Sequence, residues 1–185
     1  MHPDSVEPRL ASARPLLEFL RAHRTEADRS VAQSTLAHDG SARHRALAAV
    51  VIASFVDSDS TWWTLAEALR DRDAMVSATA SQVLSVLSNG AARPVNWAPA
   101  ADGLRAVLDG TNLSAHNTLL EALAATRVDP ALASALLGGG GELILAKLRS
   151  QDPSGARAAR RFLTQVSGHD FGQDAAAWEK WIRSL

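Results

Sequence analysis

The stretch from Asp73 to Ser88 constrains the fold of this chain more than any other segment. It reads D-A-M-V-S-A-T-A-S-Q-V-L-S-V-L-S, with apolar side chains recurring every three to four residues and serines between them. That spacing matches the 3.6-residue period of an α-helix and not the two-residue period of a strand. Asp73 stands just before the run as an N-cap. The segment therefore predicts an amphipathic helix with a narrow polar side of small residues.

The same period recurs along the chain, and no segment alternates as a strand would. Helices are expected over about 15–23, 25–38, 41–56, 60–71, 73–88, 99–109, 114–127, 130–137, 142–149, 153–166 and 175–185. Pro15 is expected in the first turn of its helix, and Gly138 to Gly141 are expected to break one helix into two. The helix over 41–56 is apolar nearly all round, so it should be the most buried.

Composition narrows the class of protein. The chain has 185 residues, a formal net charge of -1, 46% hydrophobic and 21% charged residues, which is ordinary for one globular domain. This balance argues against a disordered acidic tail and against a generally basic nucleic-acid binder. The chain has no cysteine, so disulfides, thiol nucleophiles and cysteine zinc sites are excluded. No apolar run is long enough to span a membrane and no export signal is recognisable, so a cytoplasmic location is expected.

The predicted helices fall into pairs whose second helices share a register. Small or apolar residues occupy the same early position at intervals of 34 to 40 residues, namely Ala42, Val76, Ala115 and Gly155. One turn later come Ala46, Ala80, Leu119 and Ala159, and after another turn Val50, Leu84, Leu123 and Leu163. Helix pairs of this size, with a small residue early in the second helix, resemble HEAT or HEAT-like, armadillo-type repeats over roughly residues 26–166.

The resemblance implies an all-α solenoid of about four helix pairs. It would form one domain over 1–185, with an N-terminal cap over 1–24, repeats over 25–166 and a C-terminal cap over 167–185. The tail R-R-F-L-T-Q-V-S-G-H-D-F-G-Q-D-A-A-A-W-E-K-W is similar to the terminal segment of some bacterial HEAT-like proteins. In such a cap, Phe171, Trp178 and Trp181 would cover the end of the last repeat.

The resemblance also implies a non-catalytic protein-interaction scaffold or adaptor, because such repeats present their second helices side by side. The candidate protein-binding residues on that face are Arg43, His44, Ser77, Ser81, His116, Asn117, Arg157, Arg160 and Arg161. Any amphipathic helix must have a polar side, so a merely solvated face is the alternative at these positions. Arg157 and Arg161 should project together towards an acidic partner, whereas Arg160 is placed to meet an internal carboxylate.

No motif predicts catalytic, cofactor-binding or metal-binding residues, and no cofactor is expected. His38, Asp39 and His44 straddle a turn without the spacing of a zinc site, and no phosphate-binding glycine motif is present. HEAT-like folds include alkylpurine DNA glycosylases, so DNA binding or DNA repair is one alternative. The basic cluster near Arg157 favours it, but the acidic residues between Asp57 and Asp73 oppose a phosphate track. A helper similar to bilin lyases is a further alternative that rests on fold analogy alone.

Overall fold

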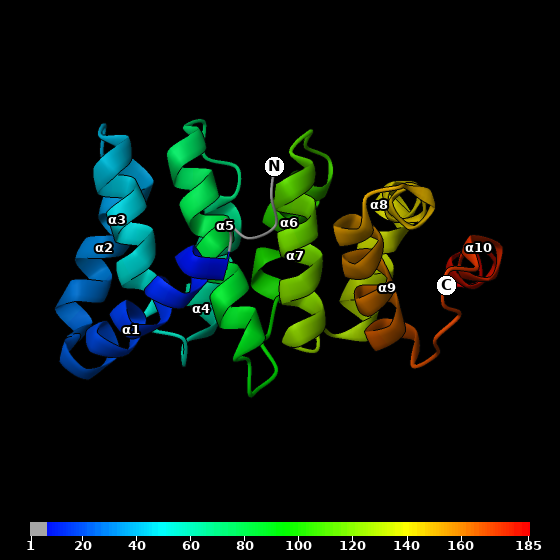
Figure 1. Cartoon of the computed structure of the whole chain (residues 1–185), viewed down its shortest axis with the longest axis horizontal. Coiled ribbons are helices and arrows are strands. Elements are labelled where there is room, and N and C mark those ends of the chain that lie inside the picture. Colours follow the sequence, from blue (N-terminus) through cyan, green and yellow to red (C-terminus); the bar gives the residue numbers. More distant parts are fainter. Residues whose placement is uncertain (1–6) are drawn as a thin grey trace. The chain divides into compact units, whose positions relative to one another are not determined.

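The computed structural model describes the backbone of residues 7–185 and the side chains of residues 15–138 and 141–185. The described backbone is helical and contains no strand, which confirms the predicted all-α class. The chain groups into two compact units, residues 1–90 and 91–185, whereas the sequence predicts one domain over 1–185. Figure 1 labels the helices of both units.

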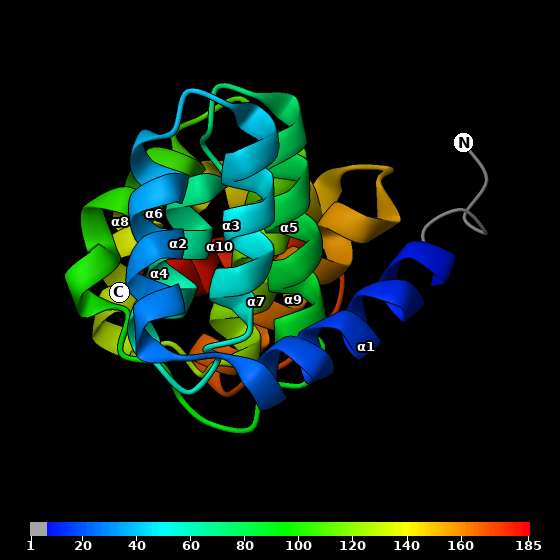
Figure 2. The ribbon, with the colours of Figure 1, turned by 90° about the vertical axis from the view of Figure 1, so that its left-hand side faces the viewer.

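The described part of the first unit contains five helices that pack mainly around α3. They are α1 (Glu7–His23), α2 (Glu26–His38), α3 (Ala42–Ala53), α4 (Asp59–Ala68) and α5 (Ala74–Asn89). Figure 2 shows α3 between α2 and α5, with α1 running obliquely near their lower ends. The pair α2–α3 is thus followed by the pair α4–α5, and the second helices of the two pairs lie side by side.

The second unit contains two further helix pairs and a terminal helix. Its elements are the short 3-10 helix η2 (Ala98–Ala100), α6 (Ala101–Leu108), α7 (Leu113–Ala125), α8 (Pro130–Arg149), α9 (Pro153–Ser167) and α10 (Ala175–Ile182). Here α7 packs against α9, α8 packs against both α6 and α9, and α10 packs against α8. The second helices of this unit's two pairs are therefore neighbours as well.

Polar N-caps determine where most of these helices begin. Thr25 and Asp28 form a reciprocal capping box, in which Asp28 Oδ2 accepts from the Thr25 backbone N–H at 2.7 Å. Aspartates accept backbone N–H groups of the first turn in four other helices, at Asp73, Asp129, Asp152 and Asp174. The sequence predicts each of these caps, because Thr25, Asp73, Asp129, Asp152 and Asp174 each stand just before a periodic apolar run, where an acceptor satisfies otherwise unpaired donors.

The predicted start of the first helix is wrong. α1 begins at Glu7 and contains Pro15 in its interior instead of in its first turn. Proline removes one helical hydrogen bond, and here the helical turns continue on both sides of it. The helical spacing of Leu16, Leu17 and Leu20 predicts that all three are buried, but only Leu17 is fully buried, while Leu16 is 48% exposed. α1 therefore covers less of the unit than its sequence suggests.

The four glycines from Gly138 to Gly141 bend α8 and do not break it. Helical structure continues through them, but the arms Pro130–Gly138 and Gly141–Arg149 meet at 84°. A Cβ at Gly141 would lie 3.1 Å from Ile182 Cγ2, so glycine at this position allows α10 to pack closely. The prediction of two helices separated by a loop is corrected to one bent helix.

A helix that crosses a membrane needs roughly 20 consecutive, mostly apolar residues. Among the residues that the structure describes, no single helix is long and apolar enough to cross a membrane. The two arms of α8 reach that length and apolarity only when they are taken together.

The core of the first unit is centred on α3. Ala49, Ile52 and Ala53 are completely buried, but the prediction that this helix is the most buried one is wrong, because a larger share of α7 is buried. The helix is also not covered all round, because Leu47 is 65% exposed. Trp62 of α4 is buried beside this core, and its indole N–H donates to the Val56 carbonyl at 3.2 Å. A buried tryptophan needs such a partner for its one polar atom.

The core of the second unit is closed at each end by a buried tryptophan. Trp97 donates its indole N–H to Thr126 Oγ1 at 2.8 Å, which ties the proline-containing connection before α6 to the end of α7. Trp178 of α10 is completely buried, donates to the Gly172 carbonyl at 3.1 Å and contacts the edge of Phe171. The predicted burial of the terminal tryptophans is confirmed for Trp178, whereas Trp181 is half-buried.

Candidate functional site

The predicted binding residues lie on the second helices, and in each unit those helices are neighbours. Arg43 and His44 belong to α3, and Ser77 and Ser81 belong to α5, which packs against it. In the other unit, His116 and Asn117 are on α7, and three arginines, Arg157, Arg160 and Arg161, are on its neighbour α9. Each unit therefore brings its own predicted residues onto one pair of helices.

On α3, the two predicted residues are exposed and a third, unpredicted residue is buried. Arg43 is exposed, and His44 Nδ1 lies 3.1 Å from Asp39 Oδ2. A hydrogen bond from the Ser41 backbone N–H and the contact with His44 lower the pKa of Asp39. Arg45 points inward and is only 5% exposed. The first turn of α3 therefore has both a solvent-facing and an inward-facing basic residue.

Arg45 joins α3 to the turn that precedes α5. Its Nε and Nη2 donate to the two carboxylate oxygens of Asp71 at 2.8 and 2.9 Å, and its Nη1 donates to the Asp39 carbonyl at 2.8 Å. The paired hydrogen bonds raise the pKa of Arg45 and lower the pKa of Asp71. This two-point ion pair is a structural joint. It could have been anticipated, because Arg45, Ala49 and Ile52 follow one buried stripe at helical spacing.

On α5, the predicted serines offer little to a partner. Ser77 is half-buried, and its hydroxyl donates back to the Ala74 carbonyl at 3.3 Å. Ser81 is also half-buried. This face of α5 is uncharged and small, so the exposed charge of the α3–α5 helix pair lies on α3.

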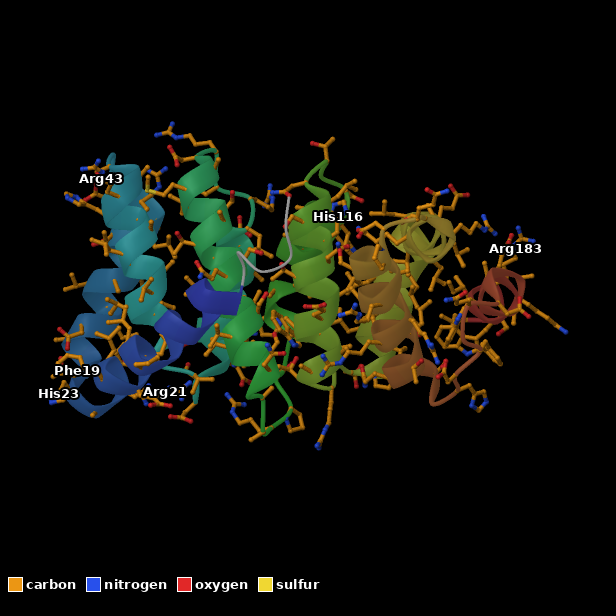
Figure 3. The ribbon with its side chains drawn as sticks, in the orientation of Figure 1. Phe19, Arg21, His23, Arg43, His116 and Arg183 are labelled. Carbon is orange, nitrogen blue, oxygen red and sulfur yellow. The ribbon has the colours of Figure 1, made fainter. Side chains whose placement is uncertain are left out.

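The prediction that His116 lies in an exposed row is wrong. Its side chain is 1% exposed and faces the carbonyls of Val107 and Gly110 at the end of α6. Figure 3 labels His116 among the helices of the second unit. Neither ring nitrogen reaches a partner with hydrogen-bond geometry. Burial, and then the charge of nearby Lys147, lower the pKa of His116. The residue belongs to the core because it shares a helical stripe with Leu119, Leu120 and Leu123.

Asn117 is engaged inside the protein and is not free for a partner. Its Oδ1 accepts from Lys147 Nζ at 2.6 Å, and its Nδ2 donates to Ser154 Oγ at 3.4 Å. Lys147 is 7% exposed and also donates to the Leu113 carbonyl at 3.4 Å. Burial lowers the pKa of Lys147, and the charge of Asp152 partly opposes this change. Asn117 thus connects α7 to both α8 and α9.

Gly155 allows α9 to approach α7 at this junction. A Cβ at this position would lie 2.8 Å from Asp152 Oδ2 and 3.4 Å from Asn117 Oδ1. Asp152 is held in place because it accepts the backbone N–H groups of Ser154 and Gly155. The register position that is alanine or valine in the other second helices is therefore glycine here for a steric reason.

The three arginines of α9 divide into one bound and two available residues. Arg160 forms a two-point ion pair with Asp170, with Nε 2.9 Å from Oδ1, but both side chains are about half exposed, so the partner is not the internal carboxylate that the sequence predicts. Arg157 and Arg161 are exposed, and neither forms an ion pair with a residue that the structure describes. They are four residues apart, so they lie on one face of the helix.

Glu121 of α7 lies next to Arg157 and Arg161. It is half-buried, and burial raises its pKa, while the charges of Arg161 and then Arg157 act in the opposite direction. It lies beyond ion-pair distance from both arginines. We define the α7–α9 surface by Glu121, Arg157 and Arg161. This surface presents two guanidinium groups and one partly shielded carboxylate, so it can accept an anionic group.

No three histidine, aspartate or glutamate side chains of the described residues lie close enough together to hold a metal ion. No protein-family model matches the chain, and no curated protein matches it.

Proposed function

We propose that this chain is a non-catalytic protein-interaction module of HEAT-like type, and that its α7–α9 surface binds an acidic segment of a partner protein. The observation that supports this most is the pair of exposed arginines, Arg157 and Arg161, on one face of α9. Arg160 beside them is already paired with Asp170. Guanidinium groups recognise carboxylates with two parallel hydrogen bonds, and two such groups one helical turn apart fit an acidic peptide.

Stacked helix pairs supply the HEAT-like part of the proposal. α3 and α5 are neighbours in one unit, and α7 and α9 are neighbours in the other. The repeat positions Ala46, Ala80, Leu119 and Ala159 are all buried, as the shared register requires. Leu84, Leu123 and Leu163 are completely buried as well. This agreement favours repeated helix pairs as the organising unit.

The test compares partner binding by the full chain and by the double variant Arg157→Glu/Arg161→Glu. Proteins captured by each are quantified, and the affinity of any protein lost with the variant is measured at low and high salt. We expect at least a tenfold loss, mainly through slower association, and a weaker dependence on salt in the variant. Helical content and melting temperature should stay nearly unchanged, because both side chains are exposed.

The matched control is Arg21→Glu/Arg72→Glu, which changes the net charge equally at exposed positions away from α9. The control should retain binding. If the control loses binding as strongly as the α9 variant, then net charge and not the α7–α9 surface explains the effect. If neither variant changes the affinity of any partner, Arg157 and Arg161 are ordinary solvated residues.

A further inference from the structure

The first unit has an apolar pocket on its surface. The pocket has a volume of about 480 Å³ and is walled by α1, α2 and α3. Leu20, Val31, Leu47 and Val51 supply most of its apolar surface. Figure 2 views the molecule from the side on which α2 and α3 lie next to each other. Figure 3 labels Phe19 and His23, which belong to the α1 wall of this region. Its volume lies within the range of small-molecule sites, about 300–1,000 Å³.

Two of the apolar side chains that line the pocket are unusually exposed. Val31 is 66% exposed and Leu47 is 65% exposed, and Phe19 beside the pocket is 60% exposed. Large apolar side chains that cluster on a surface indicate a site that a ligand or partner covers. Apolarity alone does not select the occupant, so the polar groups of the pocket must do so.

One lining residue, Arg24, has a hydrogen-bond donor without an acceptor. Its Nη2 donates to Asp57 Oδ2 at 3.0 Å, and its guanidinium carbon lies 4.8 Å from the centre of the Phe55 ring. Its Nη1, in contrast, is buried and donates to no atom of the described residues. A buried cationic donor without a partner is costly, and a ligand that supplies an anionic acceptor would remove that cost.

The other ionisable groups that line the pocket are already occupied. Asp28 Oδ2 accepts both the backbone N–H and the hydroxyl of Thr25 at 2.7 Å. His23 Nδ1 lies 2.8 Å from the Phe19 carbonyl, and His44 Nδ1 lies 3.1 Å from Asp39 Oδ2. Among the ionisable residues that line the pocket, the buried polar atom without a partner is therefore Arg24 Nη1, which requires an acceptor and not a donor.

We propose that this pocket binds a medium-chain carboxylate, with its head group on Arg24 and its acyl chain along α2 and α3. Of the lining residues, His44 lies in the first turn of α3 and Ser54 directly follows the last residue of that helix, next to Phe55, whose ring lies against the Arg24 guanidinium. These ten residues of helix rise about 15 Å. A straight chain of about twelve carbons has a comparable length. The proposal is independent of the α7–α9 surface.

The experiment is calorimetric titration of the full chain with octanoate, decanoate and dodecanoate below their micelle concentrations, with decanol as the neutral analogue. Saturable binding of one decanoate per chain is expected, at least tenfold tighter than decanol. Each additional CH₂ group should lower the dissociation constant about fourfold, since burying one CH₂ contributes about 0.8 kcal/mol. Chemical shifts in ¹H–¹⁵N spectra should change at Arg24 and Leu47.

Four variants assign the binding to the proposed groups. Arg24→Gln should reduce decanoate affinity to that of decanol and leave decanol unchanged, and Leu47→Glu should weaken both at least tenfold. Asp57→Asn breaks the same ion pair as Arg24→Gln but leaves the donor in place, so decanoate should bind at least as tightly as to the wild type. Met75→Glu changes an exposed apolar residue outside the pocket and should have no effect.

Other results would overturn the proposal. Equal affinities for decanoate and decanol would exclude recognition of the carboxylate by Arg24. Absence of saturable binding would exclude an acyl ligand and leave the face to a macromolecular partner. An effect of Met75→Glu as large as that of Leu47→Glu would indicate non-specific adsorption to apolar surface.

Discussion

The two units join their neighbouring second helices through different buried polar groups. In the first unit, Arg45 of α3 forms a two-point ion pair with Asp71 before α5, and the two side chains are 6% and 13% exposed. In the second unit, the buried cation is Lys147, which donates to the neutral oxygens of Asn117 and Leu113. His116 near it makes no hydrogen bond. One junction thus contains a charge that is hydrogen-bonded to its counter-charge, whereas in the other the cation is hydrogen-bonded only to neutral oxygens and the charge of Asp152 acts on it from a greater distance.

This difference appears in the direction of the pKa shifts. The ion pair raises the pKa of Arg45 and lowers that of Asp71, so the protein stabilises both charged forms. Burial lowers the pKa of both Lys147 and His116, so the second junction disfavours their charged forms relative to water. We therefore expect the first junction to depend on keeping both partners and the second to tolerate loss of charge.

The largest expected effect is that of Asp71→Asn. The change keeps the size of the side chain but leaves the buried Arg45 guanidinium without a counter-charge, which is strongly destabilising. The melting temperature should fall more than for any other variant considered below. The double variant Arg45→Met/Asp71→Asn should recover part of the loss, as measured in a double-mutant cycle. A single variant as stable as the wild type would show that the ion pair contributes nothing to the joint.

Gly155→Ala should come next in size. The new Cβ would lie 2.8 Å from Asp152 Oδ2, and Asp152 cannot move without losing its capping hydrogen bonds. Overpacking of this kind costs about 1–3 kcal/mol of unfolding free energy. The control is Gly138→Ala in α8, where the added methyl meets open space and should cost nothing. Denaturant unfolding measures both, and a Gly155→Ala variant at or above wild-type stability would contradict the close approach of α9 and α7.

Lys147→Met should have a small effect and directly sharpens the comparison of the junctions. Methionine keeps the apolar stem of lysine and removes a cation that has no carboxylate partner within hydrogen-bond distance. We expect the unfolding free energy to change by less than about 1.5 kcal/mol, in either direction. A loss as large as that of Asp71→Asn would mean that the two junctions are energetically alike.

The helices of both units could be predicted from the sequence because their determinants are local. Apolar residues at helical spacing and acceptors such as Asp73 and Asp152 lie next to each other in the chain. An ion pair of Arg160 could also have been predicted, because Asp170 follows only ten residues later in the chain. The structure therefore reproduces most of the features that depend only on residues close together in the chain.

Long-range partners decide the rest and could not be read from spacing alone. Helical spacing places Arg45 on the buried stripe of α3, but it does not show that the partner of Arg45 is Asp71, 26 residues away. His116 was assigned to the polar side of α7, but α6 covers it. The pocket near Arg24 depends on where α1 lies against α2 and α3, which no residue pattern in the chain determines. A sequence signal did exist for Lys147, because Ile144, Lys147 and Leu148 share one helical stripe.

The smallest expected effect is a pH dependence that originates in the second junction. The pKa of His116 in the folded chain lies below its ordinary value of 6.5, so the unfolded chain takes up this proton first as the pH falls. The stability contributed by neutral His116 is therefore complete above about pH 6.5 and decreases below it, by at most about 1.4 kcal/mol per pH unit for one proton. Replacing His116 with Gln removes the titrating group, so melting temperatures measured between pH 7.5 and 5.5 should fall less steeply in the variant. The Lys147→Met variant should also show a shallower pH dependence than the wild type, because the charge of Lys147 is the second cause of the lowered pKa of His116. Parallel curves for all three proteins would place the pH sensitivity outside this junction and would remove the electrostatic difference between the two units near neutral pH.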